Sequence, residues 1–212
     1  MRPLVVFGSG QIAQLALHYF TTDTDREVIA LTVDATYLPE GPCFGLPVLP
    51  FESLVETHPP SEVDLFIALS YRSRNRIRRE RFLTGQEAGY RFASYISSHA
   101  TVLNGHDIGE NCFILEDNTI QPFVRIGDNT TLWSGNHIGH HSTIGSHIFI
   151  ASHIVVSGNV TIEDSVFLGV NATLRDGITV GHEAIVGAGA LVMQDVPAQS
   201  VLAPEGTPRS ER

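Results

Sequence analysis

The second half of the chain repeats every six residues, and this period restricts its fold more than any other feature. Steps of six from Ile96 to Val192 visit 17 positions, and each one is Ile, Leu or Val. These amino acids make up 54 of the 212 residues, so chance does not explain an unbroken run. A hexad of short strand and turn, repeated without interruption from 96 to 197, is typical of a parallel β-helix, in which stacked coils bury the aliphatic positions.

The first 95 residues lack this period, which predicts two domains, residues 1–95 and 96–212. The formal net charge of −10 argues against a nucleic-acid or membrane partner, because both would require a basic surface, and favours a small-molecule ligand. Cys43 and Cys112 do not have the spacing of a zinc site or a disulfide framework. The N-terminal apolar run is too short for a signal peptide or a membrane span, so a cytoplasmic protein is expected.

The N-terminal residues predict a small α/β domain that binds phosphate. A buried strand at 4–7 is followed by a glycine turn and a helix. The apolar side of this helix carries Ile12, Leu15, Ala16 and Tyr19. The turn matches Gly-x-Gly-x-x-Ala, in which glycines let a ligand approach the backbone and the helix N-terminus offers N–H groups to an anion. The predicted substrate contacts are Gly8, Ser9, Gly10 and Gln11.

Further apolar runs predict strands at 27–33, 63–69 and 90–96 and a helix at 72–85. The strand at 27–33 leads into Asp34, at the distance from Gly10 where such domains place an acid that hydrogen-bonds a sugar or base. Alternatively, the glycines only form a tight turn and Asp34 caps a strand end. Six arginines between 72 and 81 could bind phosphate, or they could form a solvated helix face.

The whole chain resembles a family of bacterial sugar acetyltransferases. The resemblance lies in a Rossmann-like domain, the phrases GLPVLPFESL (45–54) and FIAL (66–69), and the hexapeptide repeats. The family includes sialic acid O-acetyltransferases and N-acetyltransferases of nucleotide-linked amino sugars. It implies a left-handed β-helix with three hexads per triangular coil, a nucleotide-sugar in the small domain, a homotrimer, and acetyl-CoA between adjacent β-helices. With no long insertion in the repeats, the active site would be built from short turns and a neighbouring subunit.

Five histidines lie within 17 residues, at positions 137, 140, 141, 147 and 153, and raise the question of a metal site. With three hexads per coil, side chains stack when they are separated by three hexads or a multiple of three. No two of the eight histidines from His99 to His182 are separated by three or six hexads. His141, His147 and His153 would occupy three different corners, so no metal is expected, although contacts between subunits could still assemble a site.

The family motif is a His, then Asp or Glu, a small residue, any residue, Ile and Gly, and here it reads HHSTIG from His140. The resemblance makes His140 the general base that takes a proton from the attacking amine. His141 stands in the place of the carboxylate that orients the base. Either His141 does that work as a neutral hydrogen-bond partner, or an acid from elsewhere does. His140 could also be no more than an exposed turn residue.

The other site residues follow from the resemblance. Gly158, three hexads after His140, would give its N–H to the oxyanion of the thioester carbonyl. The remaining acetyl-CoA contacts would be Phe149, Gly169, Val170, Gly187 and Ala188. Trp133 stands where many relatives carry Asn, and with Phe149 in place of a histidine it implies a more apolar substrate site. The glycines could instead serve only the turns. The tail from 201 lacks a glycine of the family's ending, so no adenine contacts are assigned there.

The sequence therefore predicts an acetyl-CoA-dependent N-acetyltransferase that acts on a nucleotide-linked amino-deoxysugar by direct attack, with His140 as base. O-acetylation of a sugar hydroxyl, which needs the same residues, is the first alternative. A metal-dependent or non-enzymatic β-helix protein is the second.

Overall fold

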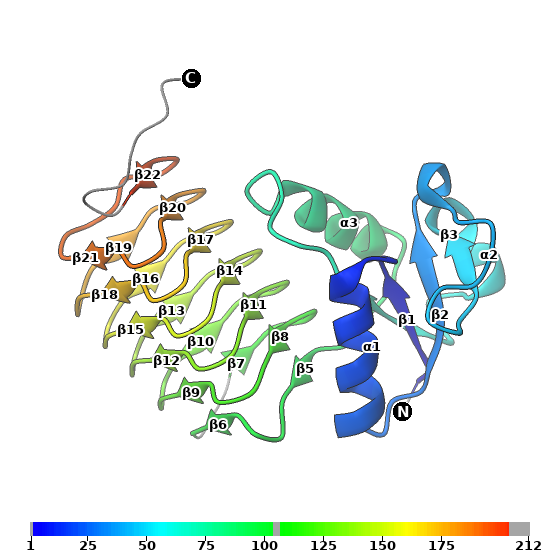
Figure 1. Cartoon of the computed structure of the whole chain (residues 1–212), viewed down its shortest axis with the longest axis horizontal. Coiled ribbons are helices and arrows are strands. Elements are labelled where there is room, and N and C mark those ends of the chain that lie inside the picture. The colour runs from blue at the N-terminus through cyan, green and yellow to red at the C-terminus, as the bar shows by residue number, and fades with distance from the viewer. Residues whose placement is uncertain (1, 104–106, 204–212) are drawn as a thin grey trace. The chain divides into compact units, whose positions relative to one another are not determined.

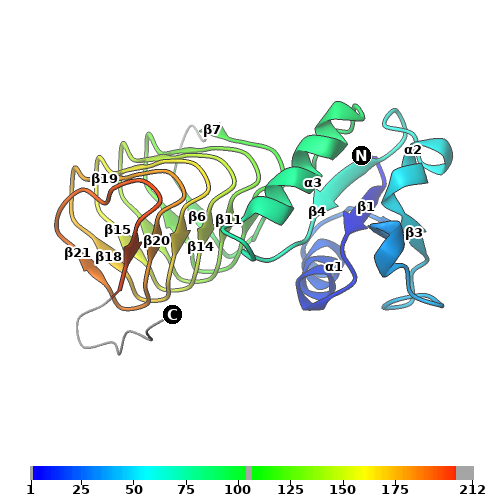
Figure 2. The ribbon, with the colours of Figure 1, turned by 90° about the horizontal axis from the view of Figure 1, so that it is seen from above.

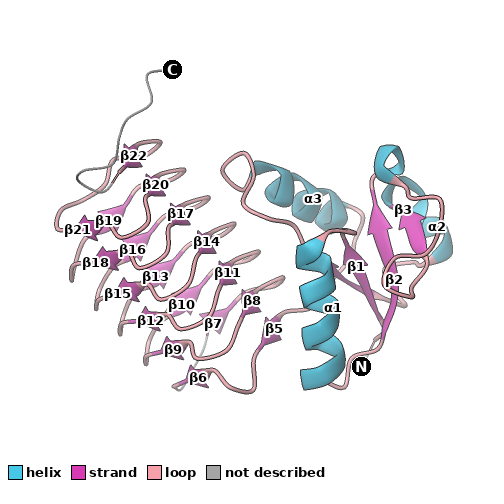
Figure 3. Cartoon of the chain, viewed as in Figure 1, coloured by secondary structure: helices cyan, strands magenta, loops and turns pink. Residues whose placement is uncertain are grey.

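The structure is a computed structural model that describes residues 2–103 and 107–203 (Figure 1). The chain divides into two compact units, residues 1–97 and 98–212. Helices occur in the first unit, whereas short strands and turns make up the described part of the second (Figure 3). Within the described ranges, every helix is too short or too polar to cross a bilayer.

The first unit is built on a four-stranded parallel sheet in the order β3-β2-β1-β4. Its strands are β1 (Leu4–Phe7), β2 (Val28–Val33), β3 (Val48–Pro50) and β4 (Asp64–Ile67). Its helices are α1 (Gln11–Asp23), α2 (Leu54–Thr57) and α3 (Arg76–Glu87), with short 3-10 turns at Ala35–Tyr37 and Phe51–Ser53. The fully buried β1 and β4 explain why their sequences are continuous apolar runs rather than alternating ones.

Helices cover both faces of this sheet. On one face, Val5 and Leu65 pack in a cluster with Leu54 of α2 and Phe82 of α3. On the other face, the ring of Phe20 from α1 meets the ring of Phe66 at 5.0 Å. The sheet with helices on both sides agrees with the predicted α/β class, although it has only four strands.

Three sequence expectations for this unit need correction. The residues that α1 buries are Ala13, Ala16 and Phe20, so its inner face is rotated from the predicted one, because the small alanines allow close packing on the sheet. Strand β3 has no counterpart among the predicted strands; it lies at the edge of the sheet, where its proline is tolerated. In the predicted last strand, only a bridge at Phe92 and the two-residue β5 (Tyr95–Ile96) form.

The second unit stacks two-residue strands into three parallel sheets (Figure 2). Sheet 1 contains β6 (Thr101–Val102), β9 (Thr119–Ile120), β12 (His137–Ile138), β15 (Val155–Val156), β18 (Thr173–Leu174) and β21 (Leu191–Val192). Sheet 2 contains β7 (Asp107–Ile108), β10 (Arg125–Ile126), β13 (Thr143–Ile144), β16 (Thr161–Ile162) and β19 (Thr179–Val180). Within the second unit, sheet 3 contains β8 (Phe113–Ile114), β11 (Thr131–Leu132), β14 (Phe149–Ile150), β17 (Phe167–Leu168), β20 (Ile185–Val186) and β22 (Val201–Leu202).

Strands from β6 to β21 pair with the strand three hexads away, as in Arg125 with Thr143 and His137 with Val155. The predicted aliphatic ladder is confirmed from Ile114 to Val192, where every sixth residue is at most 3% exposed, whereas Ile96, Val102 and Ile108 are only partly buried. Three parallel sheets built from hexapeptide repeats fit the predicted left-handed β-helix. The repeat ends after β21, since β22 follows at a longer interval, and the predicted tail lies outside the described residues from 204 onward.

Turns join the sheets at three corners. Corner I, between sheets 1 and 2, comprises 121–124, 139–142, 157–160 and 175–178. Corner II, between sheets 2 and 3, comprises 109–112, 127–130, 145–148, 163–166 and 181–184. Corner III, between sheets 3 and 1, comprises 115–118, 133–136, 151–154, 169–172 and 187–190.

Every turn of these corners has one residue in the left-handed conformation, at regular hexad spacing from Asn111 to Gly189. Asn, Asp, His and Gly fill many of these places, because they adopt positive φ at low cost. His141, His147 and His153 are three of them, with φ of 59°, 62° and 57°, and they lie on corners I, II and III respectively. The turn geometry thus accounts for much of the histidine-rich stretch.

Candidate active site

Corner I carries the predicted base. His140 and His141 lie in the turn between β12 and β13, with exposed side chains. Their Nδ1 atoms are 3.1 Å apart, so when both rings are neutral one Nδ1–H donates a hydrogen bond to the other Nδ1. The ring of His141 packs against Phe123 with centroids 4.7 Å apart, and the backbone N–H of His140 donates to Oε1 of Gln121 at 2.9 Å. The coil below therefore holds the pair in place.

Gly158 lies one coil beyond His140 on the same corner, as the spacing of three hexads predicts. A Cβ atom on Gly158 would stand 2.6 Å from Cε1 and 2.9 Å from Nε2 of His140. It would also stand 2.9 Å from Oδ2 of Asp176, which lies one further coil along the stack. Any side chain at 158 would displace the imidazole, so the glycine lets the His140 ring lie directly over the backbone.

The backbone N–H of Gly158 donates no hydrogen bond to any acceptor in residues 2–103 and 107–203. Gly158 is nevertheless buried, and buried N–H groups are rarely left without an acceptor. A Cβ on Gly139, in the coil below, would stand 2.6 Å from this nitrogen. The coils thus approach closely at these two glycines, and the Gly158 N–H keeps its donor capacity for a ligand oxygen.

Corner III and the neighbouring sheet 3 carry the residues predicted to contact acetyl-CoA. Gly169 and Val170 lie one coil below Gly187 and Ala188. A Cβ on Gly169 would stand 2.5 Å from the backbone nitrogen of Ala188, so the close approach of these coils requires glycine. Val170 and Ala188 are exposed. The two turns thus present a small, backbone-rich surface.

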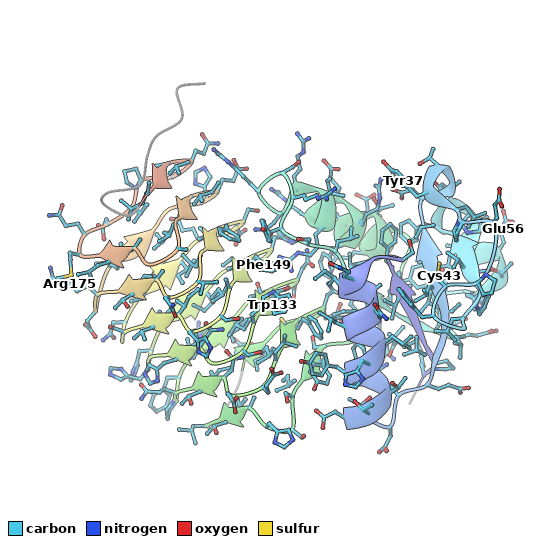
Figure 4. The ribbon with its side chains drawn as sticks, viewed as in Figure 1. Tyr37, Cys43, Glu56, Trp133, Phe149 and Arg175 are labelled. Carbon is cyan, nitrogen blue, oxygen red and sulfur yellow. The ribbon has the colours of Figure 1, made fainter. Side chains whose placement is uncertain are left out.

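Trp133 and Phe149 lie next to each other, with ring centroids 6.2 Å apart (Figure 4). Phe149 also stacks with Phe167 at 5.9 Å, so an aromatic row follows sheet 3. The indole Nε1 of Trp133 is buried and has no hydrogen-bond acceptor among the described residues. Since buried donors usually have a partner, this N–H is a place for a ligand or partner oxygen.

The predicted site residues of the second unit form two groups. His140, His141 and Gly158 meet on corner I, whereas Gly169, Val170, Gly187 and Ala188 lie on corner III with Trp133. A single chain does not bring these two groups together.

The predicted phosphate contacts line a pocket of about 560 Å³ in the first unit. The pocket lies where β1, β2 and β4 end, which is where open parallel sheets bind ligands. Gly8, Ser9, Gly10 and Gln11 form one wall, and Asp34 forms part of another. The structure thus brings together all five residues that the sequence singled out in this unit.

The two glycines of this turn have different reasons to be glycine. Gly8 has a φ of +129°, and a Cβ there would stand 2.9 Å from the carbonyl oxygen of Ala68. Gly10 has open space around the position of a Cβ, so the protein itself does not exclude a side chain there. Gly10 is also the N-cap of α1, and no side chain caps the helix at this end. The free space and the uncapped N–H groups suit a phosphate.

Asp34 lines the pocket, but its carboxylate is paired with an arginine. Arg81 of α3 approaches it with two nitrogens, at 2.8 Å between Nε and Oδ1 and 2.9 Å between Nη2 and Oδ2. Among the other arginines of the 72–81 run, Arg78 is buried and bonds Asn75, while Arg72 is exposed and lines the pocket. The arginines of this run therefore have different environments, and the run as a whole is neither a phosphate-binding site nor a solvated helix face.

Sequence reasoning missed several residues of these sites. Tyr37, which is 73% exposed, lines the pocket, and no local pattern marks it. The arginine run was singled out as a whole, but the sequence did not show that Arg72 lines the pocket or that Arg81 pairs with Asp34. Asp176, however, is six hexads after His140, so a second step of the stacking rule would have found it.

Family models for hexapeptide repeats match two parts of the chain. The model for "bacterial transferase hexapeptide (six repeats)" matches residues 105–140, and that for "hexapeptide repeat of succinyl-transferase" matches residues 159–194. These matches confirm the predicted hexapeptide repeats. No curated protein has a significantly similar sequence.

Solved structures with a similar fold cover nearly the whole chain. Perosamine N-acetyltransferase from Caulobacter crescentus, a mutant in complex with CoA and GDP-perosamine, is 23% identical, with a TM-score of 0.84 over 94% of this chain and 92% of the other. The acetyltransferase domain of PglB from Neisseria gonorrhoeae is 23% identical, with 0.80 over 95% and 96%. WeeI from Acinetobacter baumannii is 23% identical, with 0.78 over 96% and 97%. At this identity the likeness establishes a shared fold.

Proposed function

We propose that the protein is an acetyl-CoA-dependent N-acetyltransferase that acetylates the amino group of a nucleotide-linked amino-deoxysugar. The observation that carries this proposal is the meeting of His140 with Gly158, whose buried N–H has no acceptor in the described residues. A base and an oxyanion donor side by side are the two groups that acyl transfer to an amine requires.

The chemistry can be written for this corner. A sugar amine is largely protonated near neutral pH and must lose a proton before its nitrogen can attack the thioester carbon. The carbonyl oxygen then becomes negative, and the Gly158 N–H would donate to it. When the carbon–sulfur bond breaks, the CoA thiolate leaves and the new amide has released a second proton. His140 would take these protons one at a time and return one to the thiolate and one to solvent.

Acetyl-CoA would bind along corner III and sheet 3. This surface offers backbone groups and little bulk, at Gly169, Val170, Gly187 and Ala188, which suits an extended pantetheine arm. The buried Trp133 N–H has no acceptor among the described residues and could donate to the ligand. Because corners I and III are separate in one chain, we infer a homotrimer in which corner III of one subunit faces corner I of the next. The similar Caulobacter structure contains CoA and GDP-perosamine, and one Neisseria structure contains acetyl coenzyme A, which supports this assignment.

The Rossmann-like first unit, residues 1–95, would hold the nucleotide. The pocket offers the Gly8 to Gln11 turn and the N-terminus of α1 for phosphate, and Tyr37 for stacking against a base. Asp34 would contact the sugar or base while it remains paired with Arg81. Both co-substrates are cytoplasmic metabolites, so we place the protein in the cytoplasm.

The test is to incubate the full chain with acetyl-CoA and a panel of GDP-, UDP- and dTDP-linked amino-deoxysugars. CoA release would be followed with a thiol reagent, and products would be examined by mass spectrometry. The matched control is the same nucleotide-sugar with a hydroxyl in place of the amine. We expect an acetyl amide product with at least one amine and none with the control.

Other outcomes would distinguish the alternatives. Transfer only to hydroxyl acceptors would replace the proposal with O-acetylation, which uses the same base. Loss of activity on chelation would indicate a metal, and absence of CoA release with every acceptor would contradict an acetyltransferase.

A further inference from the structure

Asp176 is a carboxylate at the proposed site whose role neither the sequence pattern nor the fold explains. It is exposed on corner I, and its Oδ2 would be 2.9 Å from a Cβ on Gly158, the same distance as Nε2 of His140. The imidazole and the carboxylate therefore converge over the glycine from neighbouring coils. A nitrogen atom lying over this glycine can be within hydrogen-bond reach of both.

Carboxylates at the same place in other turns serve the fold, whereas Asp176 does not. On corner II, Oδ1 of Asp128 and of Asp164 each accept a hydrogen bond at 2.8 Å from the backbone N–H one coil below, on Glu110 and Ser146. The corresponding N–H for Asp176 belongs to Gly158. No hydrogen bond or ion pair joins the Asp176 carboxylate to the residues that the structure describes.

The groups around His140 and Asp176 do not neutralise the Asp176 carboxylate. His141 contacts the Nδ1 side of the His140 ring, whereas its Cε1–Nε2 edge and Oδ2 of Asp176 both lie near the position of a Cβ on Gly158. Arg175 is adjacent in sequence, but its guanidinium donates to the carbonyl oxygen of Met193 at 3.2 Å (Figure 4). The carboxylate of Asp176 is thus not neutralised by its neighbouring arginine.

We infer that Asp176 binds the amino group of the substrate and supplies the negative charge that the His140–His141 pair lacks. This inference rests on the proposed function. The substrate ammonium would donate one N–H to Asp176 and another to Nε2 of His140, which takes that proton and leaves the amine free to attack. The carboxylate would then stabilise the imidazolium, while His141 accepts a hydrogen bond from Nδ1–H.

The test compares Asp176→Asn with wild type and with Asp117→Asn. Asp117 is an exposed carboxylate on corner III, so its replacement removes the same charge elsewhere on the β-helix. For Asp176→Asn we expect kcat/KM for the amine to fall by about 10- to 100-fold, the effect of losing a charge-assisted hydrogen bond. Part of this loss should appear as a higher KM for the amine, because the carboxylate holds the substrate ammonium, whereas Asp117→Asn should keep the wild-type KM.

Asp176→Glu and the unfolding curve separate this role from a structural one. The glutamate variant should lower the KM for the amine toward the wild-type value, and unfolding followed by Trp133 fluorescence should be unchanged in Asp176→Asn. A lower kcat/KM with an unchanged KM would overturn the inference, as would wild-type kinetics in Asp176→Asn. If wild type itself acetylates no amine, the proposed function fails first, and that result is distinct from an active wild type with an indifferent Asp176.

Discussion

The two units of the protein find partners for their polar side chains in different ways. In the first unit the partners outside the helices come from unrelated places in the chain, as when the buried Asp64 pairs with Arg26 at 2.7 Å, or Tyr90 donates to the carbonyl of His58 at 2.7 Å. In the second unit the partner usually lies three hexads away, because one turn lies above another. The environment of a β-helix side chain can therefore be read from the sequence, whereas that of a side chain in the first unit cannot.

Two histidines of the β-helix show how far this rule goes. His147, on corner II, is buried, and its Nδ1 is 2.9 Å from Nδ2 of Asn129. The Oδ1 of Asn129 accepts a hydrogen bond from Nδ2 of Asn111 at 2.8 Å. His140, on corner I, is exposed and lies over a glycine. The residue type is the same, and the neighbours one coil away decide whether it can serve the fold or the chemistry.

His140→Ala is the sharpest test of this difference. Removing the general base should lower kcat/KM for acetyl transfer by about 10²- to 10⁴-fold. The side chain is exposed, so unfolding followed by Trp133 fluorescence should stay as in wild type. The matched control is His153→Asn, an exposed turn histidine on corner III replaced by a residue that tolerates its positive φ. Equal activity in the two variants would remove His140 from the mechanism.

Gly158→Ala tests whether the space over this glycine matters. The new Cβ would push the His140 ring away and separate it from Asp176, so we expect kcat/KM to fall by about 10- to 100-fold. Gly41→Ala is a suitable control, because a Cβ at Gly41 meets nothing within 4 Å. A Gly158→Ala enzyme with wild-type kinetics would contradict the base assignment, because the displaced His140 ring would then be unnecessary, while the alanine keeps the backbone N–H.

On corner II the same kind of change should affect stability instead. Asn129→Ala removes a fully buried amide that bonds both Asn111 and His147, so the polar groups of these two residues each lose a hydrogen-bond partner. The expected loss is about 1 to 3 kcal/mol of unfolding free energy. Asn171→Ala is the control, since Asn171 has a similar φ of 59° but is exposed, and the difference between the variants isolates the buried hydrogen bonds. Urea unfolding followed by Trp133 fluorescence measures it, and equal losses would show that only the turn conformation matters.

The sequence predicts the second unit well because its period imposes one geometry on every coil. The strands, the buried ladder and the stacking of His140 with Gly158 all follow from counting hexads, three to a coil. The same counting leads to Asp176, two coils from His140. What counting does not give is exposure, since Asn129 and Asn171 occupy the same place in the repeat and only one is buried.

The first unit is predictable only where a local motif exists. The Gly8 to Gly10 turn and the strand before it are where the pattern places them. The partner of Asp34 is Arg81, 47 residues away in another element, and no sequence spacing encodes that pair. The predicted inner face of α1 is also wrong, because packing against the sheet, and not apolar periodicity alone, determines that Ala13 and Phe20 are buried.

The smallest predicted effect belongs to an isolated contact of the first unit. Burial raises the pKa of Tyr90 to about 12, and burial likewise raises the pKa of Tyr95. The folded state therefore holds these protons more tightly than the unfolded chain, so their stabilising contribution is complete below about pH 10 and is lost as pH rises through about 12. All five tyrosines lie in the first 97 residues, so alkaline pH should weaken that unit and not the β-helix.

Tyr90→Phe separates the two contributions of this side chain. At neutral pH the variant loses one hydrogen bond, to the carbonyl of His58, which should cost about 0.5 to 1.5 kcal/mol. Above about pH 10 its stability should fall less steeply than that of wild type, with the remaining slope due to Tyr95. Hydrogen exchange of the two units across this range is the measurement, because it reports each unit by itself. If wild type and variant lose protection equally in the first unit, or if the β-helix amides lose protection first, the ionisation of Tyr90 does not control alkaline unfolding.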